Sequence, residues 1–164
     1  RADLSGSEIE AVTVTISSYM NRLTGDAFAP GDTPQVSAQF NVRYSVASTL
    51  LRGRFDVADI QARAVLDPQV NALAARVSVE VDEAGGPFGP ARIRVVSTAG
   101  AVHCHAVEAP PGSPTLPLSD ADLDSKASAC FGSAAQPMPP DRAHALIGSI
   151  HSLEHCSNLS ALPV

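Results

Sequence analysis

The chain has no tryptophan, a single lysine and few aromatic residues, and each shortage narrows the classes of protein to which it can belong. Aromatic side chains make up 4% of the 164 residues, so the core has to be built mainly from Val, Leu, Ile and Ala. The net charge is −6 and the basic residues are scattered singly, which argues against a nucleic-acid partner. No apolar run approaches the length of a membrane span, and no stretch is typical of a signal peptide. We therefore expect no nucleic-acid and no membrane partner.

Cysteine is also scarce, and its spacing excludes the common zinc and disulfide frameworks. Cys104, Cys130 and Cys156 form no CxxC or CxxH pair, and their number is odd. Wide, unpaired spacing is typical of reduced thiols in a cytoplasmic protein. The chain starts at Arg1 rather than at Met, and its length suits one domain. We expect residues 1–164 to form a single domain, cut as a C-terminal fragment from a longer two-domain protein.

The order of the predicted elements favours an α+β fold, with helices packed on a small antiparallel or mixed sheet. Strands are expected where apolar residues alternate, and helices where a capping residue precedes an apolar stripe. The predicted strands span 8–16, 76–81, 91–97 and 101–107. The predicted helices span 34–52, 67–75, 119–131 and 141–153, with a short helical turn at 55–60. Strands and helices are segregated along the chain, so a doubly wound sheet is disfavoured.

One predicted helix carries an aromatic stripe that invites two interpretations. Phe40, Tyr44, Ala47 and Leu51 recur on one face of the segment 34–52. In the simpler interpretation Tyr44 is a core aromatic residue, and the pattern alone favours this. In the other, its hydroxyl projects into a cleft as a hydrogen-bond donor.

The segment His103-Cys104-His105 is the most conspicuous local cluster of metal-binding residue types. Residues two apart on a strand share a face, so both imidazoles could reach one metal ion. No matching pair of ligands lies nearby in the sequence, so we expect no metal site. The simpler interpretation is a strand with both histidines on its solvent face and Cys104 packed inward.

The remaining candidate motifs do not assemble a catalytic set. The chain has no G-x-S-x-G element. The glycine-rich stretch 85–89 has no helix after it, and Pro87 removes one of the N–H donors that a phosphate cradle needs. Lys126 could contact an anion, although a surface lysine is the commoner case.

Two motifs resemble segments of the MmgE/PrpD family, which includes 2-methylcitrate dehydratase, cis-aconitate decarboxylase and iminodisuccinate epimerase. The first is similar to the family pattern aQFS-x-x-Y-x-x-A followed by LL-x-G, and it runs from Pro34 to Gly53 with Asn41 in place of the common Ser. The second, from Gly112 to Lys126, is similar to G-x-P-x-x-P-(L/M)-(S/T) and its downstream Lys, with Ala127 in place of the usual Phe. The strand at 8–16 resembles the segment that precedes them, so the resemblance covers nearly the whole chain.

The resemblance implies that this chain is the lid domain of such an enzyme and packs on an N-terminal helical domain of the same polypeptide. It implies a small di- or tricarboxylate substrate and no cofactor. It places the Tyr44 hydroxyl at the interdomain cleft as a catalytic hydrogen-bond donor, with Gln39, Phe40 and Lys126 as substrate-binding residues. The family residues proposed for proton transfer have no match here, so the isolated chain is expected to be inactive.

Two other functions compete with the lid. One is a non-catalytic ligand-binding or dimerisation module, in which Phe40 and Tyr44 belong to the core or to a symmetric interface. The other, ranked last, is a small metal-dependent enzyme that uses His103 and His105. A lid without its partner exposes an apolar surface, so self-association to a homodimer is a further expectation.

Overall fold

The computed structural model describes residues 6–84, 86–156, 158 and 160. Arg1, where the chain starts, and Gly85, the first residue of the glycine-rich stretch, lie outside the described residues. Contacts between Cα atoms group the chain into two compact units, Arg1–Leu116 and Pro117–Val164, which are described separately below. The single domain over 1–164 stays a prediction.

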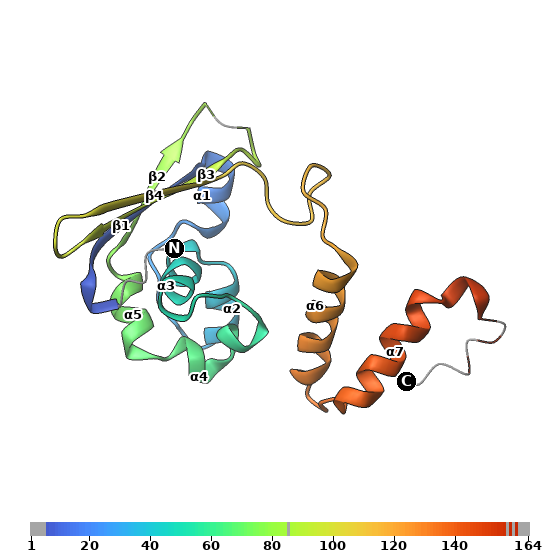
Figure 1. The fold of residues 1–164 in the computed structure, drawn as a ribbon. Helices are drawn as coiled ribbons and strands as arrows, with labels where there is room; N and C mark the ends of the chain where they lie inside the picture. The colour runs from blue at the N-terminus through green and yellow to red at the C-terminus, as the bar shows by residue number, and fades with distance from the viewer. Residues whose placement is uncertain (1–5, 85, 157, 159, 161–164) are drawn as a thin grey trace. The chain divides into compact units, whose positions relative to one another are not determined.

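The first unit contains a four-stranded mixed sheet (Figure 1). Its strands are β1 (Ile9–Ser17), β2 (Val77–Asp82), β3 (Ala91–Ser97) and β4 (Val102–Val107), in the spatial order β2-β1-β3-β4. β1 pairs in parallel with β2 and antiparallel with β3, and β3 pairs antiparallel with β4. All four predicted strands are present within a residue or two, and the α+β fold is confirmed.

Most of the helical structure of this unit lies between the two parallel strands, because a parallel pair needs a long crossover connection. After the short 3₁₀ turn η1 (Gly6–Glu8) and β1, the helical elements are α1 (Ser18–Thr24), α2 (Pro34–Gln39), α3 (Val42–Arg52), η2 (Val57–Ile60), α4 (Ala62–Val65) and α5 (Pro68–Ala74). Figure 1 shows α2 to α5 on one side of the sheet. Among the described residues of this unit, none of the helices α2 to α5 lies on the other face of the sheet.

The core forms between this helical layer and the sheet face that β1 turns toward it. Val12, Val14 and Ile16 are buried, whereas Thr13 and Thr15 point to the opposite, partly exposed face. This is the alternation that the sequence predicts for a strand with one covered face. Apolar side chains of α3, α5, β2 and β3 complete the core, among them Ala47, Val70, Leu73, Val77 and Val95.

The prediction of one continuous helix over 34–52 is wrong, because the helix is interrupted at Phe40 and Asn41 and a second helix starts at Val42. The side chain of Asn41 accepts a hydrogen bond from the N–H of Tyr44 and so caps a new helix, α3. Its amide also donates to the carbonyl of Asp26 at 2.9 Å, which fixes it to the preceding loop. Asn is among the preferred N-cap residues, so a local helix start competes with continuation of α2. The break turns Phe40 away from the core, and its side chain is 62% exposed.

The second unit contains α6 (Asp120–Gly132), α7 (Pro140–His151) and the 3₁₀ turn η3 (Leu153–His155). A capping box starts α6, in which Ser119 and Asp122 satisfy each other's backbone N–H groups, and the helix predicted over 119–131 is confirmed within one residue. In α7 the buried side chains are Ala143, Leu146 and Ile147, spaced as one helical face. Among the described residues of both units, no helix has the length and apolar character needed to cross a bilayer.

Candidate functional site

The end of α2 presents two of the predicted site residues at the surface. Gln39 and Phe40 are both exposed, at the point where α2 ends and Asn41 starts α3. Helix α2 contacts η2 and α4. Four exposed apolar side chains lie on α2 or next to the ends of these three elements, and we call them the α2–α4 apolar set: Val36, Phe40, Phe55 and Leu66. An apolar group of this size on a helical layer is typical of a surface that meets another protein surface.

Tyr44, the third residue of α3, lies in the core. Its ring is fully buried and packs against Phe28 and Phe55, with ring centroids at 4.8 and 6.1 Å. The hydroxyl donates to the backbone carbonyl of Asp59 in η2. Burial raises the pKa of the Tyr44 hydroxyl, and the neighbouring Arg52 guanidinium opposes that rise. The phenol is therefore neutral at physiological pH and serves as a hydrogen-bond donor.

A charged network lies next to that phenol, and Arg52 is at its centre. One guanidinium nitrogen of Arg52 donates to Asp59 Oδ1 at 3.1 Å, and the other donates to Asp67 Oδ2 at 3.1 Å. The same two nitrogens reach Ser48 Oγ and the carbonyl of Ala64, each at 3.2 Å. The Asp59 side chain is only 3% exposed, so removal of Arg52 would leave a buried carboxylate without its cationic partner.

This network was not predicted from the sequence. Arg52 follows Tyr44 by eight residues and Ser48 by four, so the three share one side of α3. Two aspartates follow within the next fifteen residues: Asp59 inside the predicted helical turn 55–60, and Asp67 at the start of the predicted helix 67–75. A lone Arg on the apolar side of a helix, followed by two capping carboxylates, is the signal that could have predicted it.

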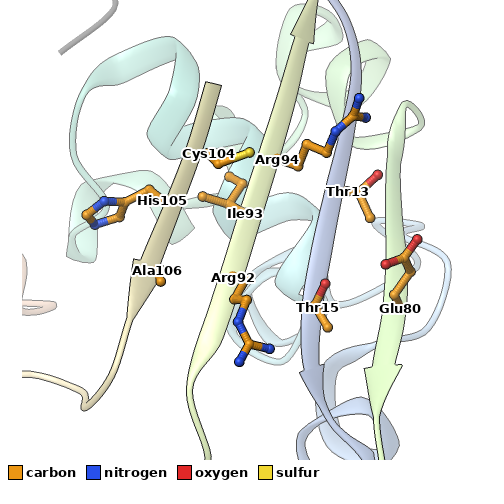
Figure 2. A pocket seen from close by; sticks show the side chains of 9 residues that line it. All are labelled: Thr13, Thr15, Glu80, Arg92, Ile93, Arg94, Cys104, His105 and Ala106. Carbon is orange, nitrogen blue, oxygen red and sulfur yellow. The ribbon is translucent and has the colours of Figure 1, made fainter. Parts of the chain in front are cut away.

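The uncovered face of the sheet contains a shallow hollow of about 640 Å³ (Figure 2). Its charged side chains are Arg92 and Arg94 on β3 and Glu80 on β2, which flank the hydroxyls of Thr13 and Thr15 on β1. Arg92 pairs with the carboxylate of Asp82 at 3.2 Å. Because the two arginines of β3 are balanced by Glu80 and Asp82 of β2, the hollow has no marked preference for an anion.

The structure places the side chains of His103, Cys104 and His105 on β4 on other faces of the sheet than the simpler interpretation predicts. Cys104 pairs in register with Arg94, so it lies on the uncovered face with an exposed thiol, and the prediction that it packs inward is wrong. His103 and His105 pair with Val95 and Ile93, on the side of the sheet that the helices cover. Both stay exposed because β4 is the edge strand and extends beyond the helical layer. Within the described part of the chain, no three His, Cys, Asp or Glu side chains are placed to hold a metal ion.

Lys126 belongs to the second unit, where it is exposed on α6. The same unit contains a charged contact that the sequence analysis did not predict: His151 Nε2 on α7 lies 2.8 Å from Asp124 Oδ1 on α6. The hydrogen bond to Asp124 and its charge raise the pKa of His151. Both partners are largely exposed, so the contact is screened by solvent.

The pKa of His151 predicts a pH dependence for the pairing of α6 with α7. A raised pKa in the folded state means that the His151–Asp124 contact stabilises the pair fully below the ordinary histidine pKa of about 6.5. That stabilisation is lost as the pH rises through the raised value. NMR titration of the His151 ring should show a midpoint above that of the Asp124→Asn variant. The control Asp141→Asn, at the far end of α7, should leave the midpoint unchanged, and equal midpoints for all three proteins would contradict the contact.

The comparisons with known proteins agree with this architecture. A search of curated proteins gives no significant match. The family model described as the MmgE/PrpD C-terminal domain matches residues 1–150. That match includes the whole of the first unit and most of the second, with both motifs that carry the resemblance. The chain therefore belongs to the MmgE/PrpD family, as its C-terminal domain.

Proposed function

We propose that this domain is the lid of an enzyme that acts on a small di- or tricarboxylate as a hydro-lyase, decarboxylase or epimerase. Its partner is the N-terminal domain that a C-terminal domain of this family implies in the full protein. The lid closes the cleft over catalytic residues held by that partner. The three cysteines are unpaired, which supports a reducing compartment, and we place the enzyme in the cytoplasm.

The observation that carries the proposal is the exposure of Phe40. Gln39 and Phe40 belong to the motif that the chain shares with the family pattern, yet Phe40 contributes 62% of its surface to solvent. An aromatic side chain of this size is costly to leave in water when a core is available. The break at Asn41 directs Phe40 outward, and Val36 and Leu66 of the same apolar set are exposed too, as a surface for the N-terminal domain requires.

The chemistry needs an acid and a base near the substrate and a site that excludes water. Loss or gain of a proton next to a carboxylate passes through an enediolate-like state, which hydrogen-bond donors stabilise. In this proposal Gln39 and Phe40 border the substrate and Lys126 contacts a substrate carboxylate. The Tyr44 hydroxyl becomes the donor when closure of the lid exchanges its bond to the Asp59 carbonyl for one to the substrate. A closed lid strengthens each of these contacts by removing water.

Complementation tests the proposal. The chain and the N-terminal domain of its own polypeptide are produced separately and assayed, alone and mixed, for turnover of 2-methylcitrate, cis-aconitate and related di- and tricarboxylates. We expect turnover only in the mixture or in the joined protein, because this chain contributes no base. Turnover by this chain alone, or full turnover by the N-terminal domain alone, would contradict the lid.

One observation favours a second candidate, a non-catalytic binding or dimerisation module. Tyr44 is buried and its hydroxyl is engaged by Asp59, as expected of a core residue with no direct part in chemistry. The two candidates differ in the effect of Tyr44→Phe on the joined protein. The lid predicts a loss of turnover, whereas the module predicts a change in stability alone.

A further inference from the structure

The hydroxyl of Tyr44 contacts one short segment, residues 53–61. Within it, the carbonyl of Asp59 accepts the hydroxyl, and the ring of Phe55 packs edge-on against the phenol at 6.1 Å. The segment begins at Gly53, whose φ of +73° ends α3 in the left-handed conformation that favours glycine. Four of its residues, Val57–Ile60, form the turn η2, in which the N–H of Asp59 donates to the carbonyl of Asp56.

Arg52 connects this segment to both of its neighbours. Through Asp59 it holds η2, through the carbonyl of Ala64 it holds α4, and through Asp67 it holds the start of α5. Asp59 in turn accepts the backbone N–H of Asp56 at 2.9 Å, so the guanidinium orders both ends of η2. No apolar residue of the segment is fully buried, and the buried carboxylate of Asp59 is its deepest anchor.

We propose that Arg52 is a positioning residue for Tyr44, which holds the segment 53–61 over the phenol and so fixes where the hydroxyl points. A planar guanidinium can donate to two carboxylates at once, as it does to Asp59 and Asp67, and a lysine ammonium cannot span both with the same geometry. The position is thus specific for arginine. Its importance for catalysis rests on the proposed function of Tyr44, but the positioning itself is a property of this chain.

The composition of the chain allows Tyr44 to be observed alone. There is no tryptophan, and the second of the two tyrosines is Tyr19. Tyr19 packs against Phe88 through its ring, so Tyr19→Phe keeps that contact and leaves Tyr44 as the only source of tyrosine fluorescence. In this background, acrylamide quenching at neutral pH measures how well the segment 53–61 covers the phenol.

Three variants are compared in that background: Arg52→Gln, Arg52→Lys and the control Arg63→Gln, an exposed arginine on α4. We expect the quenching constant to rise several-fold in Arg52→Gln, to rise less in Arg52→Lys, and to stay unchanged in Arg63→Gln. Circular dichroism at the same pH shows whether each variant is folded. A folded Arg52→Gln protein with unchanged quenching overturns the proposal, even if its melting temperature falls, because Arg52 then only stabilises the fold.

If Arg52→Gln does not fold, the same quenching measurement on Asp67→Asn tests the positioning role. Asn is as good an N-cap as Asp, so the start of α5 keeps its cap while one carboxylate partner of Arg52 loses its charge. A raised quenching constant supports the positioning role, and an unchanged one overturns it. Neither quenching measurement depends on turnover. The complementation assay can therefore refute the lid while the positioning role of Arg52 stands, and the quenching measurements can refute the positioning role while the lid stands.

Discussion

Replacement of Tyr44 by alanine should destabilise the first unit by about 3–5 kcal/mol, the range measured when a large buried aromatic residue is truncated. The phenol is fully buried and touches two other rings, those of Phe28 and Phe55. Its removal leaves a cavity between the helices and the sheet. Urea unfolding, followed by circular dichroism and by the fluorescence of Tyr19 in α1, measures the free energy of unfolding of this unit.

The companion variant Tyr44→Phe separates packing from hydrogen bonding. It keeps the ring and removes only the donor to the Asp59 carbonyl, so the expected loss of stability is about 1–2 kcal/mol. If Tyr44→Ala cost no more than Tyr44→Phe, the ring would not be part of the core. The pair also gives the joined protein a clean test, because a large loss of turnover in Tyr44→Phe cannot be attributed to misfolding.

The sequence predicted the elements whose cause is local. The alternation of Val12, Val14 and Ile16 against two threonines identified β1, and the capping box at Ser119 identified the start of α6. Both signals depend on residues a few positions apart, so they survive without knowledge of the tertiary structure. The short helices α1 and α4 were not predicted, because each has fewer than two full turns and so shows no recurring apolar positions along one face.

Features that depend on distant partners were not predictable. Asn41 was read as a variant within a helix, although its amide bonds to Asp26 and its side-chain oxygen caps α3. Cys104 was assigned to the wrong face, because the alternation on an edge strand carries no burial signal. Of the site, the burial of Tyr44 followed from the helical stripe. The Arg52 network did not, since it joins segments up to fifteen residues apart through side-chain geometry alone.

The exposure of Phe40 predicts a large effect on association and almost none on folding. Phe40→Asp should weaken binding of this chain to its N-terminal domain by at least about 2 kcal/mol, or roughly 30-fold, as for an aromatic residue at the centre of an interface. The stability of the chain itself should change by no more than about 0.5 kcal/mol, because the side chain is already largely in water. Calorimetric titration of the separate domains measures the first quantity, and urea unfolding measures the second.

A matched control is available on the same unit. Leu23 on α1 is 52% exposed, and it is not one of the residues of the α2–α4 apolar set. Leu23→Asp introduces the same charge and should leave the affinity unchanged. Equal weakening by both variants would mean that charge alone, and not the position of Phe40, opposes association. An unchanged affinity in Phe40→Asp would place the partner on another surface, and the lid would then have to close without the motif that it shares with its family.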